Sequence, residues 1–167
     1  MVSVLSCCIG LAMLIKFSVP PIELTGDVTV TKLDVSPVRS QLAAVAESKS
    51  QTAMLRFDGV VADRQPGIIW EVYAGPRDAK RDAAAPSYVG NVALYGTGIR
   101  SEARGEFKPA HFEFPLNAAI RAARRAWSGP VFLTFVPRGV GANGAHPKPM
   151  APVRIGSVAI TLEPQEP

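Results

Sequence analysis

The sequence has few of the side chains that bind metals or act as nucleophiles. Its 167 residues include only two histidines, His111 and His146, and two cysteines, Cys7 and Cys8. A transition-metal site needs several His, Cys, Asp or Glu side chains that converge at bonding distance. Neither histidine belongs to an HxH or HxxxH pair, and no Ser or Cys lies in a nucleophile elbow. We therefore predict that the chain is not an enzyme and binds no cofactor by itself.

Disulfide cross-links and nucleic-acid binding also lack support. Cys7 and Cys8 are adjacent in the apolar first segment, so they cannot cross-link the folded domain, and lipid attachment at Cys7 is a lesser alternative. The formal net charge is +4, without a block of Lys and Arg of the kind that binds phosphates. We expect no nucleic-acid partner. The mild basic excess indicates a solvated surface or a preference for an acidic protein or an anionic membrane face.

The first 19 residues contain an unbroken apolar run. MVSVLSCCIGLAMLI carries no charge before Lys16, and Pro20 and Pro21 end the segment. Fifteen helical residues span about 22 Å, and continuing to Val19 with Lys16 snorkelling approaches the roughly 30 Å hydrocarbon core. We predict a hydrophobic anchor helix over residues 1–19, with a signal peptide or a fragment of an upstream domain as alternatives. The predicted lipid-facing residues are Leu5, Ile9, Leu11, Leu14, Ile15 and Phe17.

Short strands are predicted along the rest of the chain, because 15 Pro and 14 Gly fall between apolar runs. Alternation predicts that Ile69, Glu71 and Tyr73 share one face of a strand and that Trp70 and Val72 share the other. A bend is expected at Gly59. The predicted strands lie in 23–35, 52–62, 68–75, 87–96, 111–116, 131–138 and 153–163. This pattern predicts a mainly β fold, an antiparallel β-sandwich of about seven strands with Greek-key-like connections and one short helix.

Two connections and one helix complete the prediction. Residues 36–51 are predicted as a surface connection, although LAAVAE within them could form a helical turn, and residues 76–86 as an exposed loop. The segment 117–127 has helical spacing of apolar residues, with Asn117 as its cap. We predict a linker and first strand over 20–51, a sandwich over 52–163 and a tail over 164–167.

Arginines on this helix suggest a docking surface. Arg121, Arg124 and Arg125 are displaced from the apolar stripe, and Arg138 follows the next strand. The simplest interpretation is a solvated helix face. The functional hypothesis is a positive patch that binds an acidic protein or lipid headgroups.

The order of segments resembles the C-terminal domain of the tyrosinase and polyphenol oxidase family. The resemblance covers residues 52–163 and rests on a series of short motifs. These are LRFDGV, PGIIWEVYAG, SYVGNVALYG, an F-x-F before the helix, VFLTFVPRG and VRIGSVAITLE. The resemblance implies a β-sandwich that, in full-length members, packs over the entrance of the dicopper catalytic domain. There it shields the site, often by placing one side chain in the substrate pocket.

The chain departs from the family in its copper ligands. In the family, six histidines on a helical bundle hold the copper, whereas this chain has two histidines. We therefore predict a non-catalytic, membrane-anchored accessory subunit that docks on a larger membrane protein complex and contacts the bilayer through its first segment. The alternative is a shielding or maturation domain of a dicopper oxidase supplied separately. A third possibility is a small-molecule cleft that uses Trp70, Tyr73 or Tyr88.

A location outside the cytoplasm, in the periplasm, is expected by analogy with exported domains that have a short apolar N-terminus. Lys16 alone would favour the cytoplasm under the positive-inside rule.

Overall fold

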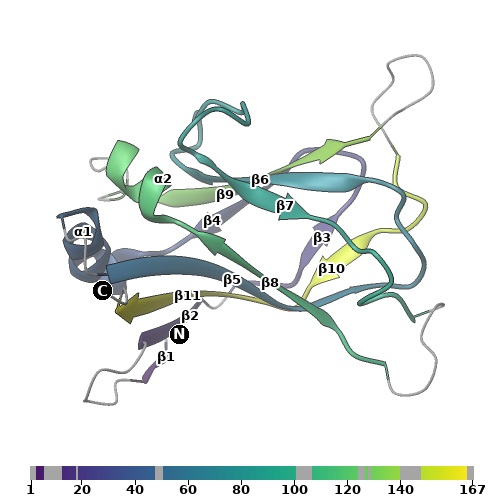
Figure 1. The fold of residues 1–167 in the computed structure, drawn as a ribbon, viewed down its shortest axis with the longest axis horizontal. Coiled ribbons are helices and arrows are strands. Elements are labelled where there is room, and N and C mark those ends of the chain that lie inside the picture. The colour runs from purple at the N-terminus through teal and green to yellow at the C-terminus, as the bar shows by residue number, and fades with distance from the viewer. Residues whose placement is uncertain are drawn as a thin grey trace.

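The chain forms a mainly β structure with two helices at one end (Figure 1). The computed structural model describes residues 3–5, 13–17, 19–47, 51–100, 107–123, 127, 129–139 and 148–164. The first elements are β1 (Ser3–Leu5), β2 (Met13–Phe17), β3 (Ile22–Leu24), β4 (Thr29–Leu33), η1 (Ser36–Val38), α1 (Arg39–Glu47) and β5 (Gln51–Ala62). Then come β6 (Ile69–Gly75), β7 (Tyr88–Val92), β8 (Ala110–Pro115), α2 (Asn117–Ala122), β9 (Val131–Arg138), β10 (Val153–Ile155) and β11 (Ser157–Pro164).

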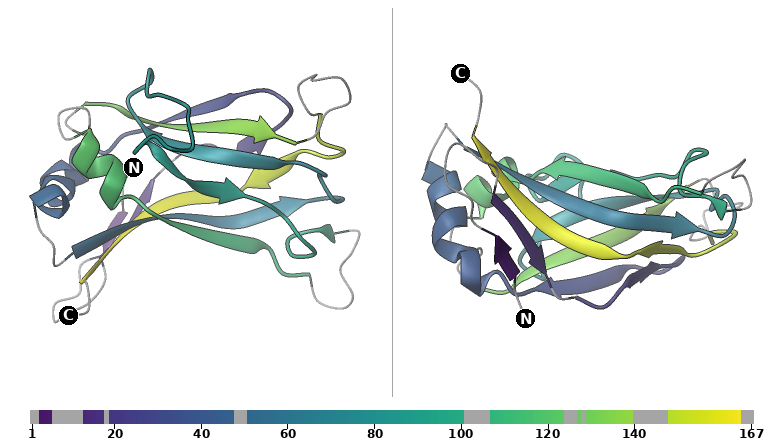
Figure 2. Two further views of the ribbon diagram at one scale, coloured as in Figure 1. Left: turned by 45° about the horizontal axis from the view of Figure 1, so that its top comes forward. Right: turned by 90° about the horizontal axis from the view of Figure 1, so that it is seen from below.

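The strands form two sheets that face each other, as Figure 2 shows from two sides. The larger sheet has the order β1-β2-β11-β5-β10-β3, and the smaller has the order β4-β9-β6-β7. The ladders in both sheets are antiparallel. The predicted antiparallel sandwich is therefore confirmed, with more strands in the described residues than the seven expected.

Strand β5 is the centre of the larger sheet. One of its edges pairs with β11 and then β10, and β8 pairs with the other. The register between β5 and β8 shifts between Phe57 and Val60, where Gly59 has a φ of 66°. On the opposite edge, the backbone N–H of Gly156 donates to the carbonyl of Asp58 at 3.0 Å. The bend predicted at Gly59 is thus a β-bulge, which lets β5 stay paired along both of its edges.

The core lies between the sheets and is rich in aromatic rings. Phe57 contacts Phe114 of the same sheet and Phe135 of the facing sheet, each with ring centroids 5.6 Å apart. Trp70 is fully buried, and its indole N–H donates to the carbonyl of Thr25 at 2.9 Å. Each such side chain contributes about 1.5–3 kcal/mol through burial. The contacts of Phe57 and Phe135 join the two sheets.

Helices α1 and α2 cover one end of the sandwich (Figure 1). The surface connection predicted over 36–51 is wrong in part, because α1 forms there. Leu42 and Val45, three residues apart, are both fully buried, and this spacing puts them on one face of a helix. A helix this short is only marginally stable by itself, and burial of the apolar pair in the core stabilises it.

The second helix is shorter than the predicted 117–127, and Asn117 does not cap it. Leu116 is the N-cap residue and makes no side-chain cap bond. The Asn117 side chain binds β5 instead: its Oδ1 accepts from the N–H of Ala53 at 2.8 Å, and its Nδ2 donates to the carbonyl of Gln51 at 3.0 Å. Asn117 therefore fastens the start of α2 to the start of β5. Of the predicted apolar stripe, Leu116, Ile120 and Trp127 are buried and Ala123 is partly buried.

The anchor helix predicted over residues 1–19 is wrong for the residues that the structure describes. Within that range, 3–5 and 13–17 are strands, and β2 pairs with β11 from Phe17↔Val158 to Met13↔Leu162. Ile15 and Phe17 are buried in the protein core, while Lys16 between them is exposed. This alternation is that of a strand on a sheet whose inner face is buried.

The other predicted lipid-facing residues lie either in strands or outside the described residues. Leu5 lies in β1 and half-buried Leu14 in β2, while Ile9 and Leu11 fall outside the described residues. In the described part of the chain, no helix has the length and apolar character that a membrane crossing requires.

Replacing a core residue of β2 tests this correction. Ile15→Ala should lower the free energy of unfolding by about 2–4 kcal/mol, because Ile15 is fully buried. Leu14→Ala, at a half-buried position of the same strand, should cost about 1 kcal/mol or less. Urea unfolding in detergent-free buffer measures both. Equal, negligible effects of the two substitutions would show that residues 13–17 do not belong to the folded domain.

A second prediction concerns the approach of β7 to β8. A Cβ on Gly90 would lie 2.6 Å from Cε1 of Phe114, so Gly90→Ala should cost about 2–4 kcal/mol. Gly96→Ala is the control: Gly96 has a φ of 77° but no atom within 4 Å of its would-be Cβ, so it should lose only about 1–2 kcal/mol. Adding Phe114→Leu to Gly90→Ala should recover part of the loss. Similar costs at both glycines would contradict the close approach.

Candidate functional site

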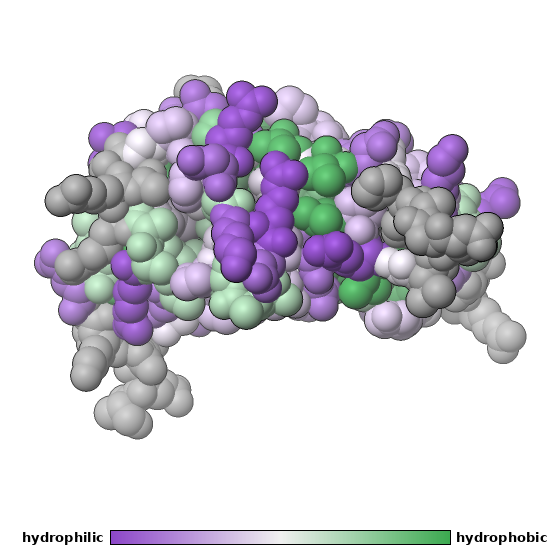
Figure 3. Space-filling view, turned by 90° about the horizontal axis from the view of Figure 1, so that it is seen from above, coloured by the Kyte–Doolittle hydropathy of each residue, from purple (hydrophilic) through white to green (hydrophobic). Residues whose placement is uncertain are grey.

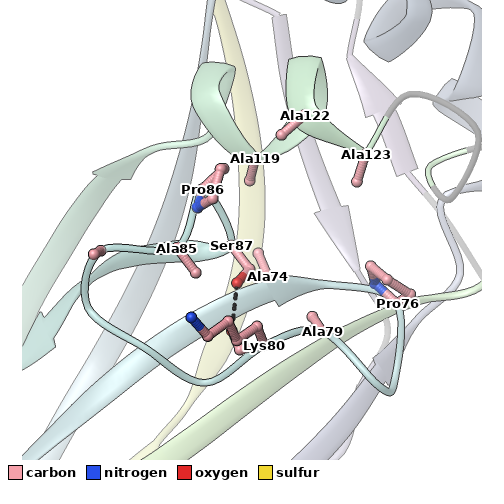
Figure 4. A pocket seen from close by; sticks show the side chains of 11 residues that line it. Ala74, Pro76, Ala79, Lys80, Ala85, Pro86, Ser87, Ala119, Ala122 and Ala123 are labelled. Atoms are coloured by element: carbon pink, nitrogen blue, oxygen red, sulfur yellow. Dashed lines mark hydrogen bonds between the residues drawn. The ribbon is translucent and has the colours of Figure 1, made fainter.

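A groove lies between α2 and the loop of residues 76–87, which joins β6 to β7 (Figure 4). Its volume is about 460 Å³, within the range of pockets that hold small ligands. The lining is made almost wholly of small apolar residues. It consists of Ala74, Ala79, Ala84, Ala85, Ala119, Ala122 and Ala123, with Pro76, Pro86, Lys80 and Ser87.

The groove exists because both of its walls are alanine. Helix α2 turns Ile120 into the core and leaves Ala122 exposed, and the facing loop presents Ala84 and Ala85. An alanine side chain ends at its Cβ, so neither wall can extend a side chain far enough to fill the space. Figure 4 shows the methyl groups of α2 above the floor formed by Ala74 and the loop.

Hydrogen bonds fix the shape of the loop. The Ser87 hydroxyl donates to the carbonyl of Lys80 at 2.7 Å, which ties the end of the loop to its middle (Figure 4). The N–H of Ala74 donates to the carbonyl of Ser87 at 2.8 Å, and the N–H of Ala79 donates to that of Pro76 at 3.0 Å. The backbone of the loop is therefore held at both ends and along its length.

Asp82 braces the same loop through its carboxylate. Its Oδ1 accepts from the N–H of Ala84 at 2.9 Å, and its Oδ2 lies 2.9 Å from the Nζ of Lys80. The backbone hydrogen bond from Ala84, followed by the interaction with Lys80, lowers the pKa of Asp82 below its usual value. The carboxylate is thus charged at neutral pH. Because these bonds already hold the loop in place, the groove is formed before any ligand arrives, and less entropy is lost on binding.

The rim of the groove carries an excess of positive charge. Arg77 and Arg81 are exposed on the loop together with Lys80 and Asp78. Arg121, a sequence-predicted residue, is exposed on α2 but does not line the groove, because a helix puts it on a different face from Ala119, Ala122 and Ala123. With the carboxylate of Asp82, the loop has three cations against two carboxylates, an excess of one positive charge. Arg124 and Arg125, the other predicted helix arginines, lie outside the described residues.

Arg138 is not part of this site. It ends β9, whose first residue follows α2, and the eight residues of β9 span about 23 Å. Figure 1 shows β9 running away from α2, and Arg138 is the last residue of that strand. Arg138 Nε donates to Glu71 Oε2 at 2.8 Å, and the Tyr73 hydroxyl donates to the same oxygen at 2.7 Å.

This Tyr73–Glu71–Arg138 cluster belongs to the outer face of the smaller sheet. Burial, with a smaller effect of the neighbouring Glu71, raises the pKa of Tyr73 to about 12. Tyr73 also packs edge-on against Tyr88, with ring centroids 5.7 Å apart. Figure 3 looks onto this face, where strongly hydrophobic residues gather beside hydrophilic ones. Val28 and Val30 of the adjacent edge are 42% and 39% exposed.

The other residues considered from the sequence lie outside the groove. Trp70 and Tyr73 are buried, and none of Trp70, Tyr73 and Tyr88 lines the groove, so the aromatic cleft stays a prediction. His111 is exposed on β8, and His146 lies outside the described residues. Within the described ranges, no group of three or more His, Cys, Asp and Glu could hold a metal ion.

Sequence reasoning missed the groove, although a signal was present. The segments 83-AAAP-86 and 118-AAIRAA-123 are the alanine-rich parts of the chain's loop and helix. Small residues in two segments indicate surfaces that cannot fill space with their own side chains. What the sequence does not show is that the two segments face each other.

Tyr73→Phe tests the cluster on the outer face. Loss of the hydroxyl hydrogen bond should lower the free energy of unfolding by about 1 kcal/mol. Because the folded-state pKa of Tyr73 lies above the usual 10.0, the wild-type protein should lose stability as the pH rises from 10 to about 12. That part of the loss should be absent from Tyr73→Phe. Denaturant unfolding against pH measures it, with Tyr95→Phe, at a 76% exposed position, as the control. Indistinguishable pH profiles for the two variants would contradict the account.

Comparison with known proteins finds similarity in the fold only. No protein-family model matches the chain, and no curated protein sequence matches it. A structure of recombinantly expressed latent aurone synthase, a polyphenol oxidase, is similar with a TM-score of 0.55 and 14% identity, covering 88% of this chain and 26% of that one. Its form co-crystallised with hexatungstotellurate(VI) and soaked in H2O2 has a TM-score of 0.54 at 14% identity, with the same coverages of 88% and 26%.

Latent aurone synthase from its natural source has a TM-score of 0.50 and 12% identity, with coverages of 85% and 25%. Identities this low show the fold alone. The coverages show that the chain spans about a quarter of the length of the polyphenol oxidase structures that it resembles. The resemblance to a domain of the polyphenol oxidase family, expected from the order of strands, is confirmed at the level of the fold.

Proposed function

We propose that the chain is a non-catalytic contact domain that docks on a larger protein, the favoured partner being a polyphenol-oxidase-type catalytic domain. The observation that carries the proposal is the fold likeness, which takes in 88% of this chain but only 26% of the similar polyphenol oxidase. A match of this kind is expected when a single domain resembles one part of a larger enzyme. The similar structures are described as latent, which fits a domain that restrains activity.

The chain's own residues do not fit a dicopper centre. Two histidines cannot supply two sets of three ligands. Any copper chemistry would come from another polypeptide or from another part of a longer one. The role left for the sandwich is binding to another protein, and a preformed groove with a charged rim is suited to this role.

The broader hypothesis, an accessory subunit of a membrane protein complex in the periplasm, stays a prediction. The described residues of its proposed anchor lie in the sandwich, with Ile15 and Phe17 in the core. We therefore do not extend the proposal to a lipid anchor. Docking on a protein does not depend on one.

Enzyme inhibition tests the proposal. The purified chain is titrated into the catalytic domain of a polyphenol oxidase that lacks its own sandwich domain, and oxidation of an o-diphenol is followed by absorbance. We expect turnover to fall several-fold as the chain saturates the enzyme, because a docked sandwich blocks access of the substrate. An unrelated β-sandwich of similar charge is the control. Unchanged turnover, with no binding by calorimetry, would rule the proposed partner out.

A further inference from the structure

We propose that the alanine-lined groove receives an apolar side chain, aromatic or branched, from an acidic segment of the partner protein. This inference rests on the proposed function and names the chemistry of the contact. It concerns the groove between α2 and residues 76–87, and it does not involve the outer face of the smaller sheet.

The size and lining of the groove determine what it can hold. A volume of about 460 Å³ exceeds that of one aromatic side chain and suits a ring together with its flanking backbone. Nine of the eleven lining residues are alanine or proline, so the walls offer apolar contact with few hydrogen-bonding side chains. A single large ring buried in such a pocket supplies much of the binding energy of a protein contact.

The rim determines what flanks that ring. Arg77, Lys80 and Arg81 belong to the loop that forms one wall of the groove, and the only carboxylates of that loop are Asp78 and Asp82. Asp82 is already engaged by Lys80 and by the N–H of Ala84. The positive excess of the loop therefore favours Asp or Glu beside the inserted residue, which steers association and fixes the register of the segment.

Mixed charge at the rim favours a protein segment over a membrane. Asp78 and Asp82 lie among the cations, and their carboxylates would face the uniformly anionic surface of a phosphatidylserine bilayer. A polypeptide can place neutral residues opposite those carboxylates and acidic ones opposite the arginines. The hydrogen-bonded loop adds to affinity, because it does not have to be ordered when the segment binds.

A designed peptide series tests the groove directly. The probe is a fluorescein-labelled peptide of about ten residues, rich in Asp and Glu, with one central Trp. Three companions have Ser in place of Trp, Lys in place of the acidic residues, or both changes. Fluorescence anisotropy with the full chain should show binding of the acidic Trp peptide, with affinity lower by about tenfold or more for each single change. Equal binding of the Trp and Ser peptides would overturn the inference, since charge alone would then explain it.

Two matched substitutions on α2 locate the site. Ala122 and Ala118 are both exposed on this helix, but only Ala122 lines the groove. Ala122→Phe should fill the groove and weaken binding of the acidic Trp peptide by about tenfold or more, whereas Ala118→Phe should leave it within about twofold. Melting temperatures of both variants verify that they fold. If Ala122→Phe folds and binds the peptide as the wild type does, the groove is not the site.

A charge reversal tests the rim in the same way. Arg81→Glu should weaken binding of the acidic peptide several-fold and improve that of the Lys peptide. Arg154→Glu, an equal change of charge at an exposed position of β10 in the other sheet, should do neither. Equal effects of the two reversals would show that net charge, and not the rim, attracts the peptide.

The outcome separates this inference from the proposed function. If the chain inhibits the oxidase and Ala122→Phe inhibits it equally, the groove inference is wrong while the proposed function stands. If the acidic Trp peptide binds in the groove but the oxidase is unaffected, the groove inference stands and the proposed partner is wrong. Sedimentation with phosphatidylserine vesicles that is lost in Ala122→Phe, without peptide binding, would assign the groove to lipid and overturn the inference.

Discussion

The structure depends on the burial of β5 between the strands paired to its two edges and the facing sheet. Its inward residues, Leu55 and Phe57 among them, are fully buried, and Phe57 reaches Phe135 across the sandwich. Both edges of β5 are paired, with β11 and β10 on one side and β8 on the other. This arrangement brings the C-terminal strand, the N-terminal β2 and the middle of the chain into one sheet. A fold of this kind is built from contacts between residues far apart in the sequence.

The same arrangement creates the groove. Strand β8 leads directly from the edge of β5 into α2, whose Asn117 is bound to the backbone of Gln51 and Ala53. The loop of residues 76–87 leaves β6 in the facing sheet and is closed by its own hydrogen bonds. The two walls of the groove therefore belong to different sheets, and packing of the core sets the distance between them. A contact site placed on a rigid framework of this kind is shaped before the partner binds.

Much of the sandwich could be predicted from the sequence, because alternation of apolar and polar residues reports which side of a strand is buried. This held for Ile69 to Val72 and for the bend at Gly59. The N-terminal segment misled for a physical reason: an apolar run without polar interruption fits a helix as well as a strand, and only the partner β11, far along the chain, decides. The arginines of the predicted helix could be singled out, but the groove between α2 and the loop could not. It requires that two alanine-rich segments meet, which is a consequence of tertiary packing.

The central claim is that this chain acts by contact, through the end of the sandwich that carries α2. Hydrogen–deuterium exchange of the chain, alone and mixed with a polyphenol oxidase catalytic domain, tests it most directly. The account predicts slower exchange in residues 76–87 and 117–122 in the mixture, with little change in β10 and β3 at the other end. Protection confined to that other end, or no protection at concentrations that saturate the complex, would contradict it.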